Sequence, residues 1–331
     1  MNRLNKILIL AGLIIFCSSA HSQDTTAQKQ DTAKIESGIP VECTQVINIG
    51  YEIAVLAVDS KGNFYVNGGN LNAIKIYNPM GEYEGNFSLQ DGQCPPPWEK
   101  MQSTITGIDI DLDDNIYLCN AGHNTIEKFT TAGDFLEKII LPKSPKGEWY
   151  GIRGVVVDEE GTIYMSAYFK FVYIFNKEGK LLRKWAKSGN EDNQYACLSA
   201  VAIDRYKKSR LKRIYLGDNY GNRVYVYSKK EKRLLFSFGN RATGPGGLFD
   251  IIDMDVDSEG YIYVLDRYLG YCSVFNTEGK FVFRFGHEEG GERFLYFPMG
   301  IFIDQNDKIY ISNSGKGCIL VYEWKRDRKR F

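Results

Sequence analysis

The chain is organised as a series of short apolar strands separated by polar turns. An Asp, a short polar turn and an apolar residue followed by Tyr recur six times, as in "DSKGNFY" (59–65) and "DSEGYIY" (257–263). The six tyrosines are spaced by 52, 47, 51, 48 and 47 residues, and they are Tyr65, Tyr117, Tyr164, Tyr215, Tyr263 and Tyr310. A nearly constant period of this length indicates a repeat architecture.

Each copy contains four strand-like segments. An apolar strand ends at the Asp ("GVVVD", "GIFID"), and a second strand follows the turn ("IYMS", "IYIS"). A third segment alternates apolar and polar residues ("RVYVYS", "CSVFN"), and a fourth follows another turn ("FVFRFG", "LLFSFG"). With no helical periodicity between them, four such strands predict one antiparallel sheet. We therefore predict an all-β fold, a six-bladed β-propeller of four-stranded blades.

The two ends of the repeat region complement each other. The sixth copy stops after its third strand, "CILVYEW", whereas "TQVINIG" (44–50) resembles the fourth strand "FVFRFG" and precedes the first copy. We expect this N-terminal strand to complete the sixth blade and close the ring, because closure removes an exposed sheet edge. An independent N-terminal strand is the alternative, and it leaves both segments unexplained.

The repeats resemble NHL repeats, most clearly in "FGNRATGPGGLFDIIDMDVDSEGYIYVLD" (238–266) and "FGHEEGGERFLYFPMGIFIDQNDKIYISN" (285–313). The resemblance covers roughly residues 43–325 and implies a six-bladed propeller. It is weaker in the fourth copy, where "YKKSRLKR" stretches the turn, and in the fifth, where Asp253 replaces the usual small residue. The Trp-Asp ending of WD40 repeats and the glycine pair of kelch repeats do not recur.

The ends of the chain have other patterns. Residues 1–22 have the order of a secretory signal peptide: Arg3 and Lys6, an apolar run too short to span a bilayer, and small residues up to Ser22. A lipid anchor on Cys17 is the alternative. Residues 23–40 are predicted to be a flexible leader, 41–325 the propeller and 326–331 a basic tail. We thus expect a secreted or periplasmic protein with no transmembrane segment in the mature chain. Disulfides can form in such a compartment, but the sequence predicts no specific pairing of the cysteines.

The balanced charge of the chain and the repetition of its aspartates reduce the number of functions to consider. Lys plus Arg and Asp plus Glu are equal at 41 each, so we expect no nucleic-acid partner. The six repeated aspartates are expected to be turn residues, because every copy of the hairpin needs an acceptor there. They are Asp59, Asp111, Asp158, Asp204, Asp257 and Asp304.

Candidate ligand-binding residues are those that differ between copies. Loops from strand four to the next strand one, and from strand two to strand three, share one face of a propeller, and aromatic rings with arginines gather in them. Such side chains suit a protein, peptide or glycan; filling gaps between blades is the alternative. The predicted ligand-binding residues are Trp149, Arg153, Tyr168, Tyr220, Arg267 and Tyr268.

Three aspartates lie at unusual positions of the innermost strands. Asp109 and Asp255 come two residues before the turn Asp, in blades predicted to face each other, and Asp253 is close by. These carboxylates are a candidate site for a divalent cation such as calcium. Solvated or backbone-bonded carboxylates are the alternative.

The catalytic motifs of common enzyme classes are missing: the sequence has no G-x-S-x-G and no H-E-x-x-H. We expect no catalytic residues and an exported non-catalytic binding or scaffold module. The alternative is a metal-dependent lactonase or lyase with its ion in the channel. For that alternative the residues to watch are Asn120, Asp218, Asp266 and Asn313, although such residues also cap loops.

Overall fold

The computed structural model describes most of one compact unit, Ile39–Phe331. The described residues are 40–68, 70–89, 104–142, 151–167, 171–185, 187–188, 194–195, 197–206, 211–231, 233–286 and 293–325. The predicted signal peptide, leader and basic tail lie outside these ranges, as do Trp149 and Tyr168. Within these ranges, no helix has the length and apolar character needed to cross a membrane.

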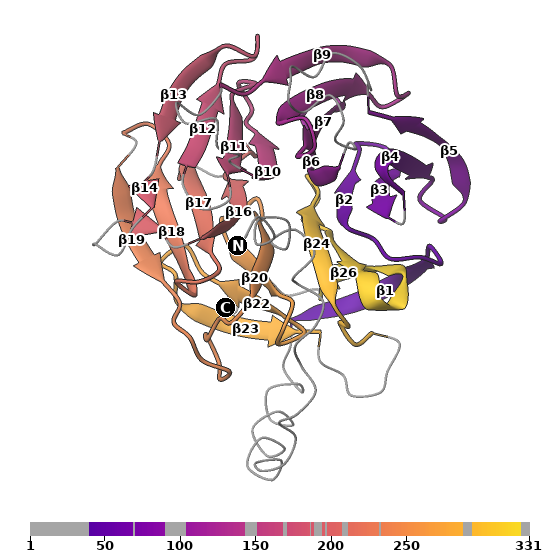
Figure 1. Ribbon diagram of the computed structural model, residues 1–331. Coiled ribbons are helices and arrows are strands. Elements are labelled where there is room, and N and C mark those ends of the chain that lie inside the picture. Colours follow the sequence, from indigo (N-terminus) through magenta and orange to yellow (C-terminus); the bar gives the residue numbers. More distant parts are fainter. Residues whose placement is uncertain are drawn as a thin grey trace, which may run out of the picture. The chain divides into compact units, whose positions relative to one another are not determined.

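Six four-stranded antiparallel sheets, the blades, are arranged in a ring (Figure 1). Blade 1 contains β2 (Val55–Val58), β3 (Phe64–Gly68), β4 (Asn70–Tyr77) and β5 (Tyr83–Ser88). Blade 2 contains β6 (Ile105–Ile110), β7 (Asn115–Asn120), β8 (Thr125–Thr130) and β9 (Phe135–Ile140). Blade 3 contains β10 (Ile152–Val157), β11 (Ile163–Ala167), β12 (Phe171–Phe175) and β13 (Leu181–Trp185).

The second half of the ring has the same order. Blade 4 contains β16 (Leu198–Ile203), β17 (Arg213–Asp218), β18 (Arg223–Ser228) and β19 (Leu234–Phe238). Blade 5 contains β20 (Ile251–Val256), β21 (Ile262–Asp266), β22 (Tyr271–Phe275) and β23 (Phe281–Phe285). Blade 6 contains β24 (Pro298–Ile303), β25 (Ile309–Asn313) and β26 (Cys318–Trp324), with a 3₁₀ turn at Ser314–Lys316. A short parallel pair, β14 (Lys187–Ser188) and β15 (Gln194–Tyr195), lies between blades 3 and 4 in the chain.

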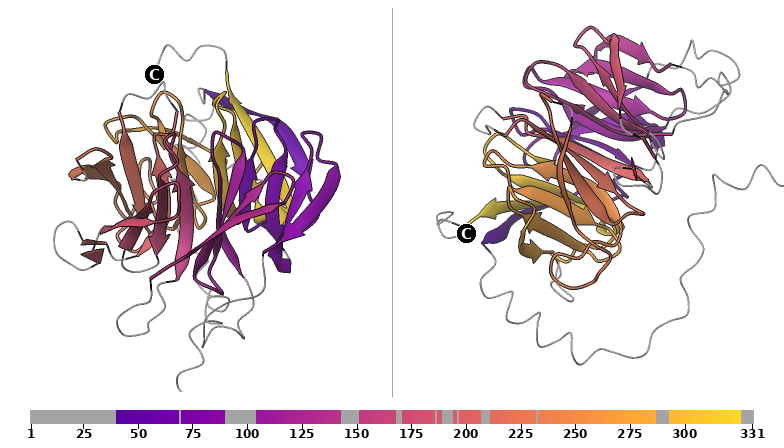
Figure 2. Two further views of the ribbon diagram at one scale, coloured as in Figure 1. Left: turned by 90° about the horizontal axis from the view of Figure 1, so that it is seen from above. Right: turned by 90° about the vertical axis from the view of Figure 1, so that its left-hand side faces the viewer.

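The N-terminal strand closes the ring, as predicted. Strand β1 (Val41–Asn48) pairs antiparallel with β26, from Val41 opposite Trp324 to Asn48 opposite Cys318. Blade 6 therefore has the order β1-β26-β25-β24, and β1 lies beside β26 in all views (Figures 1 and 2). Closure buries Val41, Cys43 and Ile47 of β1.

The repeated aspartates are turn residues, also as predicted. In blade 1, Asp59 Oδ1 accepts hydrogen bonds from the backbone N–H groups of Lys61 and Asn63, at 2.9 and 2.8 Å. In addition, each repeated Tyr donates its hydroxyl to the Asp of its own blade, at 3.1 to 3.2 Å in all six copies. The six tyrosines are buried, and this pairing explains why the Asp and Tyr recur together.

The five cysteines among the described residues are all buried, and they are Cys43, Cys119, Cys197, Cys272 and Cys318. Burial raises the pKa of the Cys119 and Cys272 thiols well above the usual value. Both thiols therefore stay protonated and act as small apolar side chains.

Candidate functional site

The innermost strands of the blades surround a channel with a cavity of about 90 Å³. These strands run from the face with the loops between strands two and three, here called the loop face, to the face with the Asp turns, here called the turn face. In β6, β10, β16, β20 and β24 the pairing register shifts at the same place, close to the loop face. Such bulges redirect a side chain and are common beside active sites.

The bulges in five blades, together with the equivalent residue of blade 1, place a ring of unlike side chains at the loop-face mouth of the channel. In blade order, the residues at this position are Ala54, Thr106, Arg153, Ser199, Ile252 and Met299, and all six line the channel cavity. Arg153, a predicted ligand-binding residue, carries the one charged side chain in this ring.

The position that follows each bulge requires a small residue in most blades. It holds Val55, Gly107, Gly154, Ala200, Asp253 and Gly300. A Cβ at Gly107 would lie 2.5 Å from the backbone oxygen of Arg153 in the next blade. In blade 5 this position carries a carboxyl group instead, so Asp253 extends from β20 toward blade 6.

Asp253 and Asp255 both connect blade 5 to blade 6. Asp253 Oδ2 accepts the Ile301 N–H at 3.0 Å, and Asp255 Oδ2 accepts the Ile303 N–H at 2.8 Å. Burial raises the pKa of Asp253 to about 7 and that of Asp255 to about 6, with Arg205 opposing the second rise. Asp253 is only half-buried, whereas Asp255 is buried, so Asp253 is the more accessible carboxyl group from the mouth.

Asp109 is held from two sides. Its Oδ2 accepts the Val157 N–H of blade 3 at 2.7 Å, and its Oδ1 lies 2.8 Å from Nη2 of Arg205, which comes from the end of β16 in blade 4. Burial raises the pKa of Asp109 and Arg205 acts against that rise. Arg205 Nη1 also donates to the Ile110 carbonyl at 3.0 Å, so this side chain crosses the channel near the turn face.

The carboxylates of the predicted cation site all line the channel cavity. Their oxygens accept backbone N–H groups of the next blade or the Arg205 guanidinium. Among the residues that the structure describes, no group of three or more His, Cys, Asp or Glu side chains is placed to hold a metal ion. These residues therefore do not fit a divalent cation as they stand, and the cation site stays a prediction.

The predicted aromatic surface is present in part. Tyr268 is 63% exposed and stacks on Phe249, with ring centroids 4.5 Å apart. Arg267 forms an ion pair with Asp250 at 2.8 Å and lies over the Phe297 ring at 5.2 Å. We call Phe249, Arg267, Tyr268 and Phe297 the aromatic cluster; it belongs to the loops of blades 5 and 6.

Tyr220 is 69% exposed on the loop between β17 and β18. Phe297 has φ 53°, a left-handed backbone conformation that is rare for a bulky residue and costs roughly 1 to 3 kcal/mol. Strain of this kind is concentrated at functional sites. No motif in the sequence predicts this backbone conformation at Phe297.

The polar residues at the ends of the second strands bind the segment that precedes the first strand of their own blade. Asp266 accepts the N–H groups of Phe249 and Asp250 at 2.6 and 3.0 Å, and Asp218 accepts the Cys197 N–H at 2.9 Å. Asn313 and Asn120 accept backbone N–H groups in the same way, and all four side chains are buried. Asp266, Asp218 and Asn120 also accept an N–H from the loop that follows them, donated by Leu269, Gly221 and His123. The capping interpretation is therefore confirmed for these three residues, whereas the Asn313 side chain makes no cap bond to the 3₁₀ turn that follows it.

Three solved structures with the same fold cover most of the chain. A virginiamycin B lyase from Staphylococcus aureus has 14% identity and a TM-score of 0.56, with 82% of each chain covered. A streptogramin B lyase has 13% identity and a TM-score of 0.56, with 82% of this chain and 79% of that chain covered. A catalytically inactive virginiamycin B lyase from Staphylococcus aureus with quinupristin has 13% identity and a TM-score of 0.57, with 87% and 90% covered.

These comparisons correct one expectation. The prediction of a non-catalytic binding or scaffold module is contradicted, because the similar structures are lyases and hence enzymes. At 13 to 14% identity the similarity shows the fold alone. No family model matches the chain and no curated protein matches it, so the NHL assignment and the kind of partner stay predictions.

Proposed function

We propose that this chain is a lyase whose active site is the loop-face mouth of the channel. The observation that carries the proposal is Asp253, a half-buried carboxyl group at a position where the other blades have only Gly, Ala or Val. It lies in the cavity wall together with Arg153, which is in the ring of bulged residues. An elimination requires a group that takes a proton and a group that stabilises the developing negative charge, and a carboxyl group and a guanidinium at one mouth can supply these two functions.

Asp253 is the general base in this mechanism. Its pKa of about 7 places it close to half-ionised at neutral pH, which suits a group that both takes and gives a proton. Asp253 takes a proton from the carbon next to a substrate carbonyl, that electron pair forms a carbon–carbon double bond, and the bond to the leaving oxygen breaks. The leaving oxygen then receives the proton from Asp253. Arg153 stabilises the negative charge on the carbonyl oxygen as it develops.

The aromatic cluster supports a substrate with flat rings. Tyr268 and Phe249 are already stacked on each other, and ring faces of this kind bind planar or apolar groups. The similar structures are named virginiamycin B lyase and streptogramin B lyase, and one was solved with quinupristin. We therefore take quinupristin as the substrate for the test.

The test follows quinupristin by liquid chromatography with ultraviolet and mass detection. Wild-type protein should convert it with formation of a conjugated double bond, and Asp253→Asn should lower the rate about 10²-fold or more. Arg153→Met should also reduce the rate. The matched control is Asp255→Asn, which changes a buried carboxyl group in the same strand and should retain activity. Lack of conversion by folded wild-type protein, or full activity of Asp253→Asn, would contradict the proposal.

Two further assignments belong to this proposal. The NHL type of the repeats is supported by the motifs in residues 238–266 and 285–313, and export is supported by the order of charged, apolar and small residues in 1–22. Cleavage after Ser22 is checked by N-terminal sequencing of the mature protein, and lipidation of Cys17 by mass spectrometry.

A further inference from the structure

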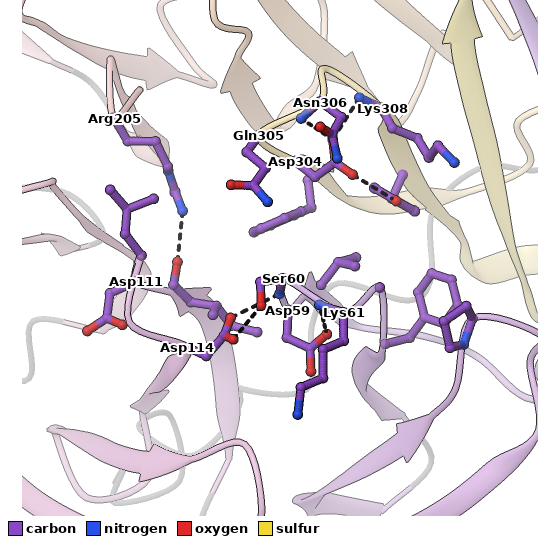
Figure 3. Close-up of a pocket in the computed structure, with 18 of the residues that line it drawn as sticks. Asp59, Ser60, Lys61, Asp111, Asp114, Arg205, Asp304, Gln305, Asn306 and Lys308 are labelled. Atoms are coloured by element: carbon purple, nitrogen blue, oxygen red, sulfur yellow. Dashed lines mark hydrogen bonds between the residues drawn. The ribbon is translucent and has the colours of Figure 1, made fainter. Parts of the chain in front are cut away.

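A second cavity, of about 290 Å³, lies on the turn face (Figure 3). It is formed by the Asp turns of blades 6, 1 and 2, and Arg205 and Tyr206 of blade 4 contribute to its wall. This volume is close to the lower end of the range for small-molecule sites. Nothing in the proposed lyase mechanism uses this cavity.

The acidic side chains around the cavity are already hydrogen-bonded. Asp114 Oδ1 and Oδ2 accept the backbone N–H and hydroxyl of Ser60 at 2.9 and 2.6 Å, which joins blade 1 to blade 2. Asp304 accepts the N–H groups of Asn306 and Lys308 at 2.8 and 2.9 Å. Asp59 and Asp111 accept N–H groups of their own turns. These carboxylates stabilise the turns, so the cavity does not present them as a cluster for a cation.

The guanidinium of Arg205, a hydrogen-bond donor, has hydrogen-bonding capacity that the described part of the protein does not use. Arg205 is only 4% exposed, its two Nη atoms are bonded to Asp109 and Ile110, and its Nε has no hydrogen-bond partner among the described residues. Figure 3 shows the Arg205 side chain along one side of the cavity, with its tip hydrogen-bonded to the backbone beside Asp111. A buried guanidinium N–H without an acceptor costs free energy until an acceptor reaches it.

The remaining walls favour a ligand that is partly apolar. Val58, Phe64, Ile110 and Phe302 line the cavity and are buried, and Arg205 lies 5.7 Å from the Phe302 ring centroid. Lys61, which is exposed at the rim and makes no ion pair within the described part of the chain, adds positive potential.

We propose that the turn-face cavity binds a small carboxylic acid with an apolar body. The carboxylate accepts the Nε–H of Arg205, and the apolar body packs on Phe302 and Phe64. A charged carboxylate is preferred to a neutral amide of the same shape because hydrogen bonds between charged groups are stronger. This site lies at the opposite end of the channel from the loop-face mouth, and Asp253 does not line it, although Arg205 and Phe302 line both cavities.

The test is isothermal titration calorimetry with benzoate and with benzamide as its neutral analogue. Benzoate should bind the full chain at least about tenfold more tightly than benzamide, as expected for a hydrogen bond to a charged group. Gln305→Trp, which places a large ring at the cavity wall, should reduce benzoate affinity about tenfold or more. Lys61→Met should reduce it about two- to fivefold.

Two controls keep the outcomes distinct. Glu259→Met changes the same turn position in blade 5, outside the cavity, and should bind benzoate as wild type does. Asp253→Asn should also bind it normally, which separates this site from the lyase proposal. The proposal is overturned if wild-type protein binds no benzoate, if benzamide binds equally well, or if folded Gln305→Trp binds benzoate with unchanged affinity.

Discussion

Arg205 of blade 4 forms an ion pair with Asp109 of blade 2 across the channel, with 2.8 Å between Nη2 and Oδ1. These blades are not neighbours in the ring, because blade 3 lies between them. The next residue, Tyr206, donates its hydroxyl to the Ile303 carbonyl of blade 6 at 2.6 Å. The stretched turn of blade 4 thus connects three blades at the turn-face end of the channel.

Removing one member of this ion pair should be strongly destabilising. Arg205→Met leaves the buried Asp109 carboxylate without its partner, which costs about 3 to 5 kcal/mol of unfolding free energy. The double variant Asp109→Val with Arg205→Met should recover much of this loss, because no charge remains buried. Urea denaturation measures both. As a control, Glu278→Gln breaks a fully exposed pair with Lys280 and should leave the midpoint unchanged. A double variant as unstable as the single one would contradict this account.

The pH dependence of stability should report on Asp253. Its pKa is raised to about 7 in the folded protein, from an ordinary value of 3.8. Between these values the folded state binds more protons than the unfolded state, so this group favours folding at low pH and its contribution falls as the pH rises toward 7. Asp253→Asn should therefore gain stability relative to wild type by about 1.4 kcal/mol per pH unit between about pH 5 and 7. Denaturation curves in that range test this, and a constant difference between the proteins would contradict it.

The hydrogen bond from the repeated Tyr to the repeated Asp should contribute to stability in each blade. Tyr215→Phe removes the donor to Asp204 in the core of blade 4, and hydrogen bonds to charged groups contribute about 1.5 to 3 kcal/mol. Guanidinium chloride denaturation should show a loss of that size. Tyr268→Phe, which changes an exposed tyrosine, is the matched control and should cause no loss. Equal effects of the two variants would mean that the pairing has no specific role.

Chelation should have little effect on the folded protein. The channel carboxylates accept N–H groups or pair with Arg205, so we expect no change in Tm with EDTA and no increase with added calcium. Differential scanning fluorimetry measures this directly. A clear increase in Tm with calcium that Asp109→Asn abolishes would restore the predicted cation site.

Deleting the closing strand should prevent cooperative folding. A chain that begins after Asn48 lacks β1 and exposes the edge of β26 together with the apolar residues that β1 covers. Exposed edges of this kind promote association. A chain that begins at Pro40 keeps β1 and is the control. Equal stability and a monomeric state for both would contradict ring closure by β1.

The fold was predictable because six copies of one pattern repeat the same physical requirement. Each copy needs an acceptor at its turn, and the Asp supplies it, so its spacing revealed the blades. The partnership of Asp with Tyr was not predicted, because an aromatic residue six positions later in a strand is also explained by packing. The stretched turn in blade 4 was noticed as a departure from the repeat, but sequence alone did not show that it directs Arg205 across the ring.

The candidate site was less predictable because it depends on contacts between blades. Asp253 was noticed as a carboxyl group where a small residue is usual, but its hydrogen bond to Ile301 joins positions 48 residues apart. The ring that includes Arg153 and Met299 arises from bulges. Because a bulge depends on how two strands pair, the sequence of one strand does not reveal it. The sequence predicts two residues of the aromatic cluster, Arg267 and Tyr268. The strain at Phe297 is visible only in its backbone angles, which the structure supplies.

The pairing of β1 with β26 sets a condition on biosynthesis. Thr44 and its hydrogen-bond partner Val321 are separated by 277 residues, so the ribosome makes the first strand of the sheet long before the strand that covers it. At typical elongation rates this interval is roughly 15 to 55 s. During that time the first five blades can form in order, while the earliest segment has no place to dock. The last blade therefore assembles only near the end of translation. Until β26 has been made, β1 has no strand to pair with in the nascent protein.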